Sequence, residues 1–232
     1  MSLERLVLVR GMNHTRATLE RWNEDPWPVL RGWLGWSLAT AVALLGGVYL
    51  VGLASTPDPT PLAIPGLTTP ATAGAVGHVL YHNGLVLALH AMACVAGFIA
   101  GASLPEVAET RTGLSRAIHE KAGPLAIGFV VCATAFSLCT QAYILGHALS
   151  TLAAQYEMSP ALLLVGILPH ALPELMALFL PLAAWVIASR RGRWNELLAA
   201  TFVTVAIAIP TLIVSSLVEL WVSPRLILAL AA

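Results

Sequence analysis

Charged residues are scarce in this chain. Only 10% of its 232 residues are Asp, Glu, Lys or Arg, and 58% are hydrophobic, whereas a soluble domain carries about 25% charged residues. Because so few charged residues cannot solvate a globular surface of this size, the composition excludes a soluble protein and predicts a membrane protein. The net charge is zero and the basic residues form no patch, which argues against nucleic acid as a partner.

Cysteine is also scarce, and recognisable cofactor motifs are absent. The three cysteines, Cys94, Cys132 and Cys139, sit in apolar runs without metal-type spacing, so we expect small buried packing residues and no disulfide framework. Neither a His-Glu-x-x-His motif nor a Gly-x-Ser-x-Gly elbow occurs. The sequence therefore indicates no metal and no cofactor, and an intramembrane hydrolase or metalloenzyme is the weakest functional hypothesis.

Long apolar runs dominate what the chain does contain. Crossing a bilayer takes about 20 apolar residues, and the candidate spans are residues 33–53, 77–102, 122–147, 169–188 and 197–222. We therefore predict an all-α, polytopic membrane helix bundle of about five transmembrane helices at 33–232, after an amphipathic cytoplasmic arm at 1–32. Residues 161–168 are too short to cross alone and predict a re-entrant or interfacial helix, with one long kinked helix as the alternative.

The segments between the spans are polar or rich in proline. In the arm we expect two short helices that end at residues 25–28, and we expect an irregular loop at 55–72. Further loops are predicted at 105–121, 150–159 and 190–196. Loops at 1–32, 105–121 and 190–196 hold 11 of the 12 Lys and Arg.

The distribution of these basic residues predicts how the chain is oriented. The positive-inside rule places the N-terminus in the cytoplasm and the C-terminus outside the plasma membrane. Tryptophans near the span ends predict an aromatic belt, formed by Trp22, Trp27, Trp33, Trp36, Trp185, Trp194 and Trp221.

Two ionisable residues interrupt the apolar run at 167–185. His170 and Glu174 are four residues apart and share one face of a helix. Ionisable groups inside the membrane cost several kcal/mol and rarely face lipid. We therefore predict a buried polar spot, whose role is structural, ion-binding or catalytic.

Other helices bring polar groups to the same depth near the outer leaflet. Pro169 and Pro173 are compatible with the first turn of a helix that starts there, and counting from predicted helix ends gives a buried polar cluster of His170, Glu174, Glu219, Asn83, Gln141 and His82. In the second span, Gly97 and Gly101 are spaced to permit close helix packing.

These motifs resemble the stage II sporulation protein M family of bacterial and archaeal integral membrane proteins. Residues 169–174, Pro-His-Ala-Leu-Pro-Glu, look like its Pro-His-Gly-x-x-Glu signature, and residues 217–224 are similar to its closing Ile-Glu-Ala-Phe-Val-Thr-Pro element. A weaker likeness lies at 81–84, so the resemblance spans roughly residues 75 to 225.

The resemblance implies a membrane scaffold or assembly factor and no enzymatic activity. The family's namesake organises peptidoglycan-degrading enzymes during engulfment in sporulating bacteria, so the implied partners are other membrane or cell-wall-associated proteins, or further copies of the chain. The alternative from the residues themselves is a proton- or cation-coupled transporter or channel subunit that uses Glu174, His170 and Glu219.

Overall fold

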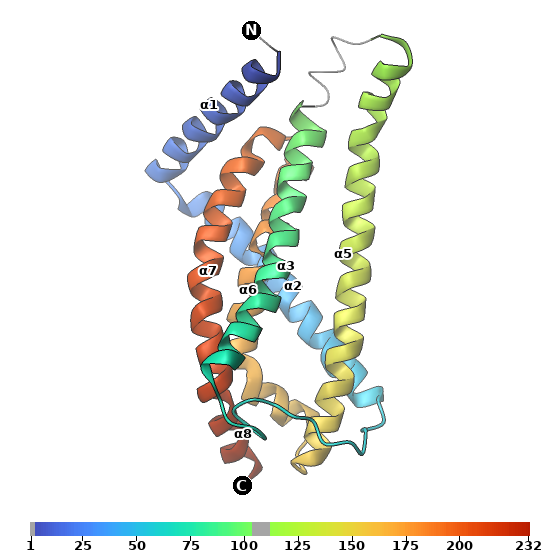
Figure 1. The fold of residues 1–232 in the computed structure, drawn as a ribbon, viewed down its shortest axis with the longest axis vertical. Helices are drawn as coiled ribbons and strands as arrows, with labels where there is room; N and C mark the ends of the chain where they lie inside the picture. The colour runs from blue at the N-terminus through green and yellow to red at the C-terminus, as the bar shows by residue number, and fades with distance from the viewer. Residues whose placement is uncertain (1–2, 104–111) are drawn as a thin grey trace. The chain divides into compact units, whose positions relative to one another are not determined.

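The computed structural model describes residues 3–103 and 112–232, and these are helical over most of their length (Figure 1). The elements are α1 (Leu3–Glu24), α2 (Trp27–Ala54), α3 (Ala73–Phe98), the π-helix η1 (Ile99–Ser103), α5 (Gly113–Gln155), α6 (Pro160–Arg191), the 3-10 helix η2 (Trp194–Glu196), α7 (Leu197–Trp221) and α8 (Ser223–Ala231). Within the described ranges, the only extended pairing is an isolated bridge between Pro65 and Thr69.

Five segments of the described chain are helical, long and apolar enough to cross a membrane. They are Trp27–Ala54, Ala73–Ala102, Ile127–Gln155, Pro160–Arg191 and Trp194–Ala231. The predicted all-α membrane fold with about five spans is confirmed. The cytoplasmic N-terminus and the external C-terminus stay predictions, as does the division at residue 32.

Several predicted boundaries are wrong. The arm forms one helix, α1, in place of two short ones, and α2 begins at Trp27. Part of the predicted loop at 105–121 lies outside the described residues, while α5 is already helical from Gly113 and continues to Gln155, into the loop predicted at 150–159. The short helix α8 was not predicted. The break at 25–28 is confirmed, because α1 ends at Glu24.

The prediction of a separate short helix at 161–168 is also wrong, because α6 runs unbroken from Pro160 to Arg191. Pro169 and Pro173 lie inside this helix and not at its start. In a membrane, neighbouring helices and side chains can satisfy the backbone groups that proline frees, so proline interrupts a helix less strictly than it does in water. The long-helix alternative is the one observed.

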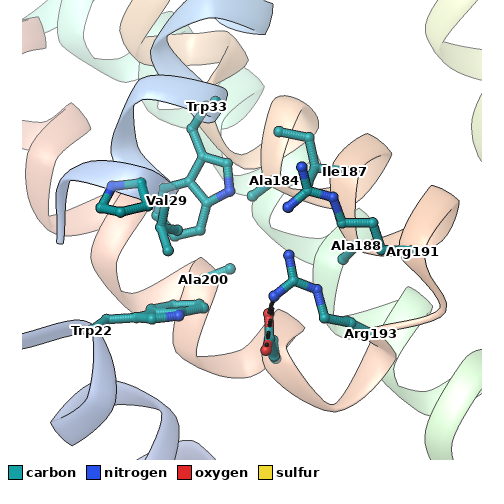
Figure 2. A pocket seen from close by; sticks show the side chains of 12 residues that line it. Trp22, Val29, Trp33, Ala184, Ile187, Ala188, Arg191, Arg193 and Ala200 are labelled. Carbon is teal, nitrogen blue, oxygen red and sulfur yellow. Dashed lines mark hydrogen bonds and ion pairs between the residues drawn. The ribbon is translucent and has the colours of Figure 1, made fainter. Parts of the chain in front are cut away.

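The chain divides into two compact units, and the long helices contribute to both. Unit 1 comprises 1–37, 87–133 and 178–207, and unit 2 comprises 38–86, 134–177 and 208–232. In unit 1, α1 packs on the ends of α2, α6 and α7 around a core of Trp22, Trp33, Leu180, Ala183, Ala184, Ala199 and Ala200 (Figure 2). The small alanines permit close helix approach.

Three tryptophans assigned to an aromatic belt are buried inside unit 1. Trp22, Trp33 and Trp185 are only 8%, 4% and 5% exposed. The Trp22 and Trp33 rings meet edge to face, with centroids 5.2 Å apart, a favourable aromatic geometry. These three side chains are therefore packed against the protein and are not part of an exposed belt.

The cysteine prediction holds only for Cys94. Cys94 is buried in unit 1, but Cys132 and Cys139 on α5 are exposed. In the most apolar stretch of the α5 span, no residue is buried by other parts of the chain, whereas 61% of the residues in the corresponding stretch of α6 are buried. An apolar sequence predicts membrane burial and does not distinguish protein from lipid as the neighbour.

The proline-rich loop of unit 2 is held by hydrogen bonds to the end of α5. Ser150 donates to the carbonyl of Ser55 at 3.0 Å, the N–H of Asp58 donates to Thr151 Oγ1 at 3.0 Å, and Gln155 donates to the carbonyl of Thr60 at 3.2 Å. The N–H of Thr60 donates to Oδ1 of Asp58 at 2.7 Å, and this bond lowers the pKa of Asp58. The loop is irregular, as predicted, yet anchored.

Gly66 lets this loop lie against the junction of α7 and α8. It adopts a φ of +84°, and a Cβ placed there would collide with the carbonyl oxygen of Leu220 and lie 3.0 Å from Pro224 Cγ. Both the left-handed backbone and the space therefore require glycine. The loop and α8 are fixed to each other through this contact.

We expect Gly66→Ala to destabilise the protein by at least about 1–2 kcal/mol, the cost of a left-handed non-glycine residue, with the collision added. Thermal unfolding in detergent would measure the change. Gly84→Ala is the matched control, because Gly84 is helical with no atom within 4 Å of its Cβ position, and it should be neutral or stabilising. Equal melting temperatures for the two variants would contradict the packing described for the loop.

Candidate functional site

α6 is the helix that carries most of the unusual polar chemistry. Besides Pro160 at its start, it contains Pro169, Pro173 and Pro181 together with His170 and Glu174. Each internal proline lacks an N–H and so removes one hydrogen bond from the preceding turn. Because hydrocarbon offers no water, other protein groups must satisfy the freed carbonyls.

In unit 1, α3 supplies donors to the turns around Pro181. His90 Nδ1 lies 2.8 Å from the carbonyl of Leu178, and Cys94 Sγ donates to the carbonyl of Pro181 at 3.0 Å. A carbonyl can only accept, so His90 carries its proton on Nδ1. The His90 ring also lies 5.8 Å from that of Phe179. His90 is therefore a hydrogen-bonded core residue.

In unit 2, His170 binds the first residue of α8. Its Nδ1 lies 2.7 Å from Oγ of Ser223, which is only 1% exposed. This bond ties α6 to the α7–α8 junction. Sequence reasoning did not assign Ser223 a role, although its place directly before Pro224 in the motif at 217–224 is a signal that could have found it.

Glu174 lies near Asn83 and Glu219, which belong to two other helices of unit 2. Asn83 and Glu219 both lie near the carboxyl group of Glu174. However, Oε2 of Glu174 and Nδ2 of Asn83 are both buried and have no partner with hydrogen-bond geometry. The three side chains therefore lie together in a largely buried environment, in which some of their hydrogen-bonding atoms have no partner.

Two carboxylates in such an environment are costly without a compensating charge. Among the described residues, neither Glu174 nor Glu219 forms an ion pair. Groups of three or more His, Cys, Asp or Glu arranged to hold a metal are likewise absent from the described part of the chain. The arrangement can hold a proton, a small cation or a polar group from another helix.

Three of the four helix ends lie farther out than predicted. Counted from the observed ends, Asn83, Gln141 and Glu174 lie about 10, 14 and 14 residues in, or roughly 15–21 Å at 1.5 Å per residue, whereas Glu219 lies close to the end of α7 at Trp221. All six residues of the predicted cluster belong to unit 2. A common depth for the cluster stays a prediction, and Asn83, Gln141 and Glu174 lie deeper along their helices than expected.

Two members of the predicted set bond within their own helices. Gln141 Nε2 donates to Oγ of Ser137 at 3.2 Å, and His82 Nδ1 lies 2.9 Å from the carbonyl of His78 in an exposed position. Depth alone does not say which way a residue faces around its helix. The structure therefore brings together Asn83, Glu174 and Glu219, and separately His170 and Ser223.

The prolines and glycines singled out in the sequence lie at packing surfaces. Pro169 and Pro173 line an open apolar cleft of about 330 Å³ in unit 2, together with Pro210, Thr211, Val214, Ser215 and Val218. In unit 1, a Cβ on Gly97 would lie 2.7 Å from Nε1 of Trp185, and one on Gly101 would collide with the Trp194 ring. Both glycines thus face tryptophan side chains.

Comparison with known proteins identifies a large part of the chain. Residues 123–224 match the family model described as Stage II sporulation protein M. This part of the chain is similar to the stage II sporulation protein M family. The resemblance found in the sequence is confirmed here, and the region includes Glu174, Glu219 and Ser223, while Asn83 lies outside it. No curated protein and no solved structure matches the chain.

We expect Glu174→Ala to destabilise this membrane protein more than Glu174→Gln does. Glutamine keeps hydrogen-bonding capacity toward Asn83 and removes the repulsion with Glu219, whereas alanine leaves a cavity and unpaired polar groups at a cost of about 1–3 kcal/mol. Thermal unfolding in detergent is the measurement, and the exposed Glu24→Ala is the control. Indistinguishable melting temperatures for the two Glu174 variants would rule out a structural contribution.

Proposed function

We propose that this chain is an integral membrane scaffold or assembly factor of the stage II sporulation protein M type. It resides in the plasma membrane with its N-terminus in the cytoplasm and organises partner proteins of the membrane or cell wall. The stage II sporulation protein M family is not a known enzyme family, which favours an organising role over catalysis. The observation that carries the proposal is a face of α5 that the chain itself leaves uncovered.

Along this face, large apolar side chains and two cysteines together recur at alternating steps of four and three residues. Leu125, Phe129, Phe136 and Tyr143 are 72%, 74%, 75% and 60% exposed, and the exposed Cys132 and Cys139 fill the intervening steps. Alternation of this kind places residues on one seam for knobs-into-holes packing with a second helix. We call this the α5 seam.

The α5 seam is bordered by polar groups. Ser137 and Gln141 bond to each other at 3.2 Å on an exposed part of the helix. A glutamine beside lipid retains unused donors and acceptors, which a hydrogen bond across a helix–helix contact would satisfy. The seam thus combines apolar contact area with a polar group that favours a protein neighbour over acyl chains.

We expect a photo-reactive amino acid at Phe136 to capture a discrete partner protein when native membranes are irradiated. The matched control is the same substitution at Leu50 on α2, which is 67% exposed and outside the α5 seam. Electrophoresis followed by mass spectrometry of the captured bands is the measurement. The partner band should appear at position 136 and not at position 50.

Two outcomes would count against this function. Equal capture at the two positions would mean that the α5 seam is an ordinary lipid-facing surface. Capture of further copies of the chain alone, through Phe136 or through disulfides at Cys132 and Cys139, would make the seam an oligomer interface without an organising role.

A second candidate function is proton- or cation-coupled transport. It is favoured by one observation, the buried and unpartnered Oε2 of Glu174 close to Glu219. Gradient-driven flux in proteoliposomes that is lost in Glu174→Gln would select this function over the scaffold.

A further inference from the structure

A small pocket in unit 1 brings aromatic and basic side chains together (Figure 2). The buried rings of Trp22 and Trp33, 8% and 4% exposed, form part of its lining. Arg191 and Arg193 also line it, and Figure 2 shows their guanidinium groups directed into the space beside Trp33. The pocket thus has a rigid aromatic side and a cationic side.

The charges at this pocket do not balance. Glu196 accepts from Arg21 at 2.8 Å and lies 3.4 Å from Arg193, and its side chain is only 17% exposed. Arg191 has no ion-pair partner among the described residues. Two guanidinium groups therefore share one carboxylate, and the third, that of Arg191, lines the pocket without an acidic partner. This leaves a surplus of positive charge suited to an anion.

The pocket lies where candidate spans begin and end. The first span starts at Trp27, the fourth ends at Arg191, and the fifth starts at Trp194. Span ends coincide with the headgroup region of a bilayer, where Trp and Arg are favoured. Nearby, the guanidinium of Arg190 lies 5.1 Å from the Trp36 ring, in cation–π geometry.

The size of the pocket restricts what can enter. Its volume is about 40 Å³, room for roughly three water-sized atoms. That space suits the oxygens of a phosphate group and is too small for a sugar or a nucleobase. Guanidinium groups bind phosphate with paired, charge-assisted hydrogen bonds.

We propose that this pocket binds the phosphate of an anionic phospholipid headgroup. Arg191 and Arg193 donate to the phosphate oxygens, and Trp22 and Trp33 form the wall against which the headgroup rests. This inference is independent of the scaffold function, because it concerns residues outside the α5 seam and a lipid ligand.

The test uses the full chain, purified in detergent and titrated with phosphatidylglycerol or phosphatidylcholine of the same acyl chains, with bound lipid measured by native mass spectrometry. Phosphatidylglycerol should bind about tenfold tighter or more, and Arg191→Gln should remove that preference while Arg191→Lys retains part of it. Arg225→Gln, which removes an exposed arginine from unit 2, is the matched control and should bind like the unaltered chain.

Three outcomes would overturn the proposal. Equal binding of the two lipids would exclude recognition of an anionic headgroup. An unchanged preference in Arg191→Gln would place the lipid elsewhere. Displacement of phosphatidylglycerol by an excess of inorganic phosphate, with binding of phosphate alone, would assign the pocket to a soluble phosphate in place of a lipid. Retention of the lipid in excess phosphate supports the headgroup.

Discussion

Polar groups that α6 carries into the hydrocarbon must find partners within the protein, and the rest of the structure follows from that constraint. In unit 1, α3 supplies His90 and Cys94, which form hydrogen bonds with the carbonyls of Leu178 and Pro181. In unit 2, α8 supplies Ser223, whose hydroxyl forms a hydrogen bond with His170. These bonds tie α3 and α8 to α6 close to its prolines, within one long helix.

The same constraint explains why small residues line the closest contacts. A side chain can reach a carbonyl on a neighbouring helix only if the two backbones approach closely, and glycine permits that approach. In unit 2, a Cβ on Gly166 would lie 2.7 Å from Cγ1 of Ile227, and one on Gly146 would lie 2.5 Å from Cβ of Val51. Not every buried polar atom is satisfied: Ser37, Trp185 and Ser189 each have one without a partner, and so do Glu174 and Asn83, which lie near each other. A pair of buried side chains with incomplete hydrogen bonds is a candidate for a functional site.

The sequence predicted the spans well, because hydrocarbon thickness sets the length of an apolar run. It also predicted that Asn83, Glu174 and Glu219 lie near one another, as they do. The prediction failed for Gln141 and His82, because counting residues from a helix end gives the position along the helix and not the side of the helix that a residue faces. It failed as well for Cys132 and Cys139, since lipid and protein interiors are equally apolar. The pocket of unit 1 depends on Arg21 meeting Glu196, 175 positions away, which no local pattern reveals.

The central claim is that the polar side chains of α6 are satisfied by other helices, and a double-mutant cycle between His170→Ala and Ser223→Ala tests it most directly. Unfolding free energies measured in detergent or bicelles should show a coupling of about 0.6–1.7 kcal/mol, the range for hydrogen bonds between membrane helices. The control cycle pairs His170→Ala with Ser216→Ala, because Ser216 bonds the carbonyl of Ile213 in its own helix, and it should be additive. Additivity in the His170–Ser223 cycle would contradict the account.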